Sequence, residues 1–408
     1  MQRRFLFWSN ARSAILSLVL VLMCIGSINV YSASFVSAAA MFGNTAYYFI
    51  KYIYYGLGGL LAMYIIGWRI NYHFWFKHEK CWAAIMLVVL LCVDAFGATT
   101  KGAQRWLSIG GFSFQPSEFV KLGVILIGSG YLGRLWQQGI RPHLLQQKSN
   151  LAFWVTAVLA FMVLIQPDMG TAAIIMALMI ILYLVAGLPW KQVGVMLGIA
   201  AVGVVCAVAV APYRLSRVVN WLDPWKDPQG NGYQMVQSLI AIGSGGWHGT
   251  NLGMGTGKFF FLPEAHTDFA FAIWCQEWGF FFAVALLAIF LLLAYAILQV
   301  AKNTTDEAGY LLVTGVNFLV VGQAIANMAM VCGLLPVIGV PLSFISYGGT
   351  SLIATLAAVG MVCAVYRDEV RKERLGQSSS QPPIPPRYTQ EGQASQPLRF
   401  RPRGWQPK

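Results

Sequence analysis

The chain has 408 residues, of which 57% are hydrophobic and only 11% are charged. Because a soluble domain carries about 25% charged residues, this composition excludes an ordinary soluble protein and indicates a membrane protein. The formal net charge of +13 is distributed over short segments between apolar runs. We therefore expect it to reflect membrane topology, with no nucleic-acid partner.

Apolar runs long enough to cross the hydrocarbon, which takes about 20 residues per helix, recur along the chain. We expect helices rather than a barrel, because runs of this length close their backbone hydrogen bonds within one helix. The first run follows Arg3, Arg4 and Arg12 and imitates a secretory signal, but the many later spans favour an uncleaved signal anchor. The ten expected helices are 13–33, 47–67, 81–97, 116–134, 151–166, 170–188, 192–212, 269–300, 309–332 and 346–366.

The charge distribution predicts the orientation of this all-α polytopic fold. Most of the 28 Lys and Arg residues fall in the N-terminal segment, alternate connections and the C-terminal segment. The positive-inside rule therefore predicts that both termini lie in the cytoplasm. Ten transmembrane helices agree with this, because an even number of crossings leaves both termini on the same side. Residues 1–366 form the predicted membrane domain. Residues 367–408, rich in Pro, Gln and Ser beyond Gly376, are expected to be a mostly disordered cytoplasmic tail.

The longest extracytoplasmic loop, about 213–268, lies between the seventh and eighth helices. Connections of this length are commonly functional or carry structure of their own. Within it, "GYQMVQSLIAI" predicts a short amphipathic helix at the membrane surface. The Gly-rich "GSGGWHGTNLGMGTG" lacks a preceding strand and the Lys-Ser end of a phosphate-binding loop, so it is interpreted as flexible re-entrant backbone.

Ionisable residues at membrane depth are expensive and are candidates for function by default. In "QPSEFVKL", Pro116 suits a first helical turn, and Glu118 and Lys121 at i, i+3 share a helix face. They either form a salt bridge that allows both to be buried or contact a substrate. In "QPDMGT", Asp168 lies where two apolar runs meet, so it is either a helix N-cap or a functional residue.

Several of these segments meet on the outer side of the predicted bundle, which suggests one outward-facing site. The motif "FLPEAHTDFAFA" brings Asp268 to the start of the eighth helix, and the Pro/Gly-punctuated 333–351 enters the last one. Positive side chains on this side suit an anionic substrate such as a pyrophosphate, although interfacial anchoring or ion pairing would also explain them. These candidates are Arg105, Lys121, Arg214, Arg217 and Lys258.

Five ordered motifs resemble those of the SEDS family (shape, elongation, division and sporulation). They are "GAQRWLSIGGFSFQPSEFVKL", "QPDMGT", "NWLDPWKDPQGNGYQMVQSLIAIGSGG", "FLPEAHTDFAFA" and "GLLPVIGVPLSFISYGG". The resemblance implies a ten-helix peptidoglycan glycosyltransferase that polymerises lipid II and works with a class B penicillin-binding protein. It maps the proposed catalytic aspartate onto Asp268, the membrane-cavity Glu and Lys onto Glu118 and Lys121, and the aspartate of the "QPD" motif onto Asp168.

This resemblance and the residues agree on one mechanism. Asp268 is expected to be the general base that takes the proton of the acceptor hydroxyl, with undecaprenyl pyrophosphate as the leaving group. His266 either orients this site or is an ordinary loop histidine. Glu264 and Asp268, four residues apart, permit a divalent cation such as Mg²⁺ or Mn²⁺ without requiring it, so the metal requirement stays unknown.

The "DPWKDP" and "LPEAHTDF" forms are closer to the cell-division branch of the family, while departures such as Gln276 and Ser343 leave elongation and sporulation roles open. Divisome or elongasome proteins and membrane lipid are the further expected partners, at the cytoplasmic membrane of a bacterium. Two other functions stay open. Intramembrane Glu118, Lys121 and Asp168 also suit a lipid II flippase, and a scaffold that recruits a transpeptidase would need no catalysis. Asp268 would then only cap the eighth helix.

Overall fold

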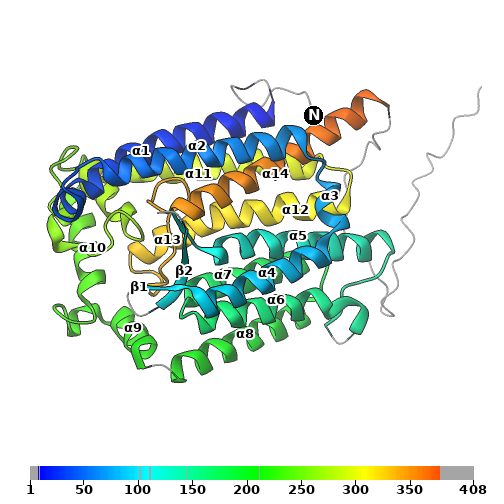
Figure 1. Ribbon diagram of the computed structural model, residues 1–408, viewed down its shortest axis with the longest axis horizontal. Helices are drawn as coiled ribbons and strands as arrows, with labels where there is room; N and C mark the ends of the chain where they lie inside the picture. The colour runs from blue at the N-terminus through cyan, green and yellow to red at the C-terminus, as the bar shows by residue number, and fades with distance from the viewer. Residues whose placement is uncertain are drawn as a thin grey trace, which may run out of the picture.

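The computed structural model describes residue 8 and residues 10–100, 103–109, 112–144, 146–210 and 212–376. The chain is a bundle of helices, most of which run along its long axis (Figure 1). The first half contains α1 Ala11–Phe42, α2 Tyr47–Tyr64 with η1 Ile65–Arg69, α3 His73–Lys77, α4 Glu79–Phe96, α5 Pro116–Gln137, α6 Gln147–Ile165, α7 Met169–Val185 and α8 Trp190–Val210. The second half contains α9 Pro212–Leu222, η2 Pro224–Lys226, α10 Tyr233–Gly245, η3 Gly257–Phe261, α11 Ala270–Lys302, α12 Glu307–Asn317, η4 Phe318–Gly322, α13 Gln323–Val331 and α14 Gly349–Arg374.

Each of the ten segments expected to cross the membrane contains a helix. Within the described residues, six helices are long and apolar enough to span it, and three shorter apolar helices accompany them. The tenth, α4, is 18 residues long and carries Glu79, Lys80 and Asp94. A predominantly helical membrane fold is therefore confirmed, while the number of segments that cross stays a prediction.

The two ends of the bundle differ in character. α1 begins and α14 ends at the same end of the bundle (Figure 1), which an even number of crossings requires. α9, α10 and the small sheet lie at the opposite end. α14 continues to Arg374, beyond the expected end of the membrane domain at residue 366, so the first residues of the tail predicted at 367–408 are helical. Residues 377–408 of that tail lie outside the described residues.

The centre of the bundle is formed by α5, α12 and α14. α5 is buried on nearly all sides, and close packing against α12 requires small residues, because a Cβ on Gly133 would lie only 2.6 Å from the Cβ of Ala308. The lipid-facing surface belongs to helices such as α11, which exposes Phe280, Phe281 and Phe282. Buried helices with small contact residues are typical of membrane bundles, where packing rather than the hydrophobic effect drives association.

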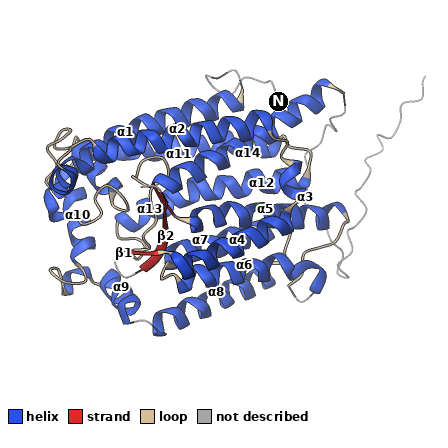
Figure 2. Cartoon of the chain, in the orientation of Figure 1, coloured by secondary structure: helices blue, strands red, loops and turns tan. Residues whose placement is uncertain are grey.

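Several elements were not predicted, among them the short helix α3, a small sheet and α9. The segment 98–114, expected to be a loop, forms a three-stranded antiparallel sheet of β1 Ala98–Thr100, β2 Ala103–Ile109 and β3 Phe112–Phe114 (Figure 2). Cross-strand pairs such as Leu107 with Phe114 stabilise it, and strands this short carry too few alternating residues to identify from the sequence. α9 was likewise expected to be loop, whereas α10 confirms the predicted helix in "GYQMVQSLIAI".

Candidate active site

The connection between α13 and α14, residues 333–348, lies at the centre of the candidate site. It is non-helical although much of it is buried, and Phe344 has a φ of 63°. Non-helical backbone at membrane depth must find hydrogen-bond partners within the protein. Five described side chains donate hydrogen bonds to its carbonyl oxygens. Tyr52 binds Phe344 (2.5 Å), Gln323 binds Pro341 (3.0 Å) and Asn327 binds Val340 (2.6 Å), while Trp221 and Arg217 of α9 bind Gly333 and Val337.

Asp268 lies against this connection in the turn that precedes α11. The Asn327 amide that binds Val340 also donates to the backbone oxygen of Asp268 at 2.8 Å. A Cβ placed on Gly339 would lie 3.6 Å from Oδ2 of Asp268, so the carboxylate faces a residue that has no side chain. α11 begins at Ala270 with Phe269 in the N-cap position and no side-chain cap. Asp268 is thus a partly exposed carboxylate and not the N-cap residue of α11.

Glu264 closes the turn that carries Asp268. Its φ is 55°, and its backbone oxygen accepts hydrogen bonds from the amides of Thr267 (3.1 Å) and Phe269 (3.2 Å). Its carboxylate also accepts from the Thr267 hydroxyl at 2.8 Å. Within the described residues, no group of three or more His, Cys, Asp or Glu side chains is arranged to hold a metal ion. These contacts of Glu264 shape the turn, and a divalent cation beside Asp268 stays an open prediction.

His266 packs between two tyrosines. Its ring centroid lies 4.4 Å from that of Tyr48 and 5.9 Å from that of Tyr347, and its backbone oxygen accepts from the amide of Tyr347 at 2.8 Å. The cluster joins the turn of Asp268 to the entry of α14.

Glu118 and Lys121 form the salt bridge that their spacing suggested. Lys121 Nζ lies 2.9 Å from Glu118 Oε2, and both side chains are almost fully buried. The same ammonium donates to Gln323 Oε1 at 2.8 Å, and Gln323 in turn holds the backbone of Pro341. The pair is therefore linked through Gln323 to the connection that contacts Asp268.

Asp168 is the N-cap of α7. Its carboxylate accepts hydrogen bonds from the amide of Thr171 (3.2 Å) and from the side chain of Gln115 (3.1 Å). The start of α7 also touches the central connection, because a Cβ on Gly170 would lie 1.9 Å from the carbonyl oxygen of Ile338. The capping alternative for Asp168 is thus found, and the cap positions a helix against the site.

The expected positive charges do not gather at one place. Arg105 donates to the backbone oxygens of Gln166 (2.9 Å) and Pro167. Arg217 is exposed on α9 and reaches the backbone of Val337 at 3.4 Å. The side chain of Arg214 lies outside the described part of the chain. Among the candidates with described side chains, Arg217 is the exposed cation that contacts the central connection.

Lys258 is placed in a different environment from the one its position in the outer loop suggested. Its ammonium forms an ion pair with Glu277, and both side chains are at most 1% exposed. Ser32 completes the group, accepting from Lys258 at 3.1 Å and donating to Glu277 at 2.8 Å. Contact between Lys258 and a substrate would require this buried pair to open.

Sequence reasoning missed Gln323 and Asn327. Both are buried, and both hold the backbone of the central connection. Two amide side chains four residues apart within an otherwise apolar run lie on one helix face. That spacing is the signal that would have found them.

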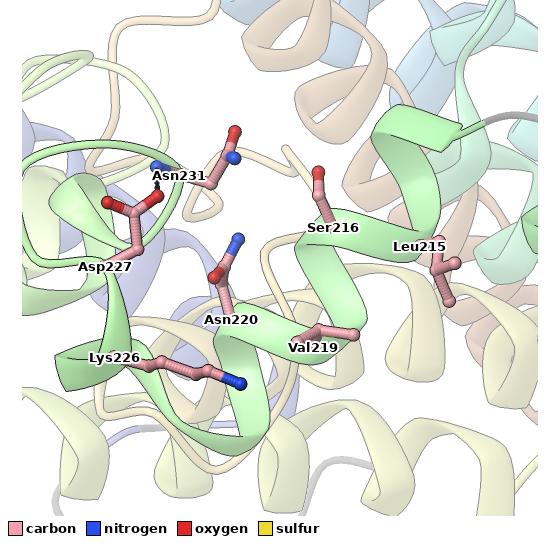
Figure 3. Close-up of a pocket in the computed structure, with 7 residues that line it drawn as sticks. All are labelled: Leu215, Ser216, Val219, Asn220, Lys226, Asp227 and Asn231. Carbon is pink, nitrogen blue, oxygen red and sulfur yellow. Dashed lines mark hydrogen bonds between the residues drawn. The ribbon is translucent and has the colours of Figure 1, made fainter.

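A separate hollow of about 450 Å³ lies between α9 and the turn after η2 (Figure 3). Asp227 stands at its rim and accepts hydrogen bonds from the amides of Gly230 (3.1 Å) and Asn231 (2.9 Å). None of the predicted site residues lines it. Its lining residues are Leu215, Ser216, Val219, Asn220, Lys226, Asp227 and Asn231.

The "Cell cycle protein" family model, that of FtsW, RodA and SpoVE, matches residues 12–371. The chain belongs to the SEDS family. Among its relatives, the "Probable peptidoglycan glycosyltransferase FtsW" of Thiomicrospira cyclica is 36% identical over 357 residues, which cover 85% of this chain and 89% of the relative. "Stage V sporulation protein E" of Bacillus subtilis is also 36% identical, covering 86% of this chain and 95% of the relative.

Solved structures of SEDS proteins share the fold. One is a chain of a peptidoglycan synthase complex that coordinates polymerization and crosslinking. It has a TM-score of 0.71 and 28% identity, and the match covers 87% of this chain and 97% of that one. The other is the rod shape determining protein RodA of Thermus thermophilus, with a TM-score of 0.63, 26% identity and coverage of 87% and 96%. Family membership and the apolar helices make this chain an integral membrane protein.

Proposed function

We propose that this SEDS protein is a peptidoglycan glycosyltransferase that polymerises lipid II into glycan strands during cell division. The observation that carries the proposal is the position of Asp268. Its partly exposed carboxylate faces Gly339, and its backbone is tied through Asn327 to Val340. The relatives named peptidoglycan glycosyltransferase FtsW support the same activity.

In the proposed reaction, the carboxylate of Asp268 accepts the proton of the acceptor sugar's 4-hydroxyl. The oxygen attacks the anomeric carbon of the donor, a carbon–oxygen bond forms, and the bond to the pyrophosphate breaks. Undecaprenyl pyrophosphate leaves with the bonding electrons. A substrate hydroxyl can reach a base that is partly exposed beside a residue without a side chain. It could not reach the carboxylate of a buried helix cap. Arg217 is the candidate cation for the departing pyrophosphate.

The other predicted residues have supporting positions in this proposal. Glu118 and Lys121 hold Gln323, and Asp168 caps α7 beside Gly170. Gln323 and the start of α7 both contact the connection 333–348. They are thus proposed to act on the site by keeping this irregular backbone in place.

We place the reaction on the outer face of the bacterial cytoplasmic membrane. The excess of Lys and Arg near the termini favours a cytoplasmic location for both of them. The opposite end of the bundle, which carries Asp268, would then face outward. Lipid II, membrane lipid and a class B penicillin-binding protein are the proposed partners, within the divisome. The likeness to a chain of a complex that joins polymerization to crosslinking supports the transpeptidase partner.

The test is polymerisation of lipid II by the purified protein in detergent, with and without its transpeptidase. We expect Asp268→Asn to lower the rate by about 100- to 10,000-fold while thermal unfolding stays unchanged. The control Glu373→Gln makes the same charge change at the other end of the bundle, in the last turn of α14, and should polymerise normally. A flippase has no bilayer to work across in detergent, so polymerisation there favours the enzyme. An Asp268→Asn variant as active as the wild type would refute the assignment.

A further inference from the structure

The second half of the outer loop has no charged side chain exposed to water before Glu264. Residues 228–257 contain no Asp, Glu, Lys or Arg. The next charged residue, Lys258, is buried in its pair with Glu277, and no other occurs before Glu264. Since about a quarter of the residues of a soluble domain are charged, a stretch of this length without a surface charge is atypical of a loop that stands in water.

The same stretch exposes large apolar side chains. Six of those that follow α10 are between 46% and 70% exposed, and we call them the aromatic patch: Trp247, Leu252, Met254, Phe259, Phe260 and Phe261. Phe260 has a φ of 64°, a left-handed conformation that aromatic residues rarely adopt. This turn leaves three consecutive phenylalanines exposed while Lys258 and Leu262 on either side are buried.

The aromatic patch continues the lipid-facing surface of the spanning helices. The ring centroid of Trp247 lies 5.1 Å from that of Phe280 and 5.7 Å from that of Phe281, two side chains exposed on α11. On the other side, the ring centroid of Phe259 lies 6.1 Å from that of Phe35 of α1. The patch thus bridges two helices long and apolar enough to span the membrane.

The loop is also tied to α11 through its backbone. α11 has a left-handed residue at Gly279, with φ 78°. Around this kink, the amides of Thr250 and Asn251 donate to the oxygens of Gln276 (3.0 Å) and Glu277 (3.1 Å). The loop is therefore held at the level where the spanning helix bends, and the patch has a set position along that helix.

We propose that the aromatic patch inserts into the outer leaflet, at the boundary between headgroups and acyl chains. Tryptophan and other aromatic residues are enriched at that depth, and interfacial elements bury their apolar side about 5–10 Å into this region. A further consequence rests on the proposed function. Because Phe261 lies shortly before Asp268 in the chain, insertion sets the height of the catalytic turn relative to the pyrophosphate of a lipid-linked substrate.

The direct test is quenching of tryptophan fluorescence by lipids with brominated acyl chains. The full chain is reconstituted in phosphatidylglycerol–phosphatidylcholine liposomes, and the signal of each tryptophan is the difference between wild type and a Trp→Phe variant. The matched control is Trp225, which is similarly exposed (58% against 63% for Trp247) but lies in the charged "DPWKDP" motif. We expect the Trp247 contribution to fall at least twofold in brominated lipid and the Trp225 contribution to stay constant.

Two results would overturn the insertion. One is a Trp247 contribution that brominated lipid leaves unchanged, as expected if a partner protein rather than lipid covers the patch. The other is equal quenching of Trp247 and Trp225, which would show no selectivity for the patch. Neither readout depends on enzymatic activity, so this inference and the proposed function can fail separately.

The consequence for catalysis has its own test, a double variant with Phe260→Ser and Phe261→Ser. Lipid II polymerisation should fall several-fold in liposomes and stay at the wild-type rate in detergent, where no leaflet sets the height of the turn. An equal loss in both would mean that the phenylalanines act within the protein fold instead. Unchanged activity in both would show that insertion does not position the catalytic turn.

Discussion

The buried pair of Lys258 and Glu277 offers a decisive perturbation, because it separates a structural role of Lys258 from a role in substrate binding. Lys258→Met removes the ammonium and leaves the carboxylate of Glu277 with Ser32 as its described hydrogen-bond partner. Adding Glu277→Gln then removes the remaining charge. The amide oxygen of the new side chain can still accept from the Ser32 hydroxyl.

The expected magnitudes follow from burial. Both side chains are at most 1% exposed, so removing one partner leaves an uncompensated buried charge, which typically costs about 3–5 kcal/mol. Replacing both partners of a buried ion pair with hydrophobic residues of similar volume is often neutral or stabilising, and Glu277→Gln likewise removes the uncompensated charge. The single variant should therefore unfold at a clearly lower temperature, and the double variant should recover to within about 1 kcal/mol of the wild type.

The assay combines thermal unfolding in detergent with lipid II polymerisation. If Lys258 stabilises the fold through Glu277, the double variant regains both stability and activity. If Lys258 instead binds the pyrophosphate, as its place in the outer loop suggested, the double variant stays inactive although it is stable. A single variant as stable as the wild type would refute the reasoning from burial altogether.

Three further changes test the supports of the central connection. Asp168→Ala should lower the free energy of unfolding by about 0.5–2 kcal/mol, the usual cost of a lost N-cap, and Asp168→Asn should restore most of it; equal losses in the two variants would contradict the capping role. Gly170→Ala should destabilise the protein, because its Cβ would lie 1.9 Å from the carbonyl oxygen of Ile338. Gly198→Ala on α8, with nothing within 4 Å, is its control and should be neutral or slightly stabilising; equal melting temperatures of the two variants would argue against this contact. Asn327→Leu removes both backbone hydrogen bonds of that amide, each worth about 0.5–1.5 kcal/mol, and should slow polymerisation about tenfold in folded protein; an unchanged rate would show that these bonds do not position the site.

Local patterns were enough to predict the helices and several contacts within them. Each expected apolar run contains a helix, because a run of about 20 apolar residues has no other stable form in lipid. The pair of Glu118 and Lys121 and the cap at Asp168 also follow from spacing, since both involve residues three apart on one chain segment. The amphipathic pattern of α10 was recognised for the same reason. α9 and the short sheet were not predicted, since their stability comes from neighbours distant in sequence or from strands too short to show a period.

The sequence by itself determined the membrane class, the helices and the motifs of the SEDS family, because composition and short-range spacing are properties of the chain alone. Only the tertiary structure decided what each polar residue contacts. Ser32 and Lys258 are 226 residues apart in sequence and share one buried group, while Asn327 of α13 joins Asp268, in the turn before α11, to Val340 in the connection before α14. The partner of a buried charge depends on which helices pack together, and that packing arises from surfaces formed by the whole bundle.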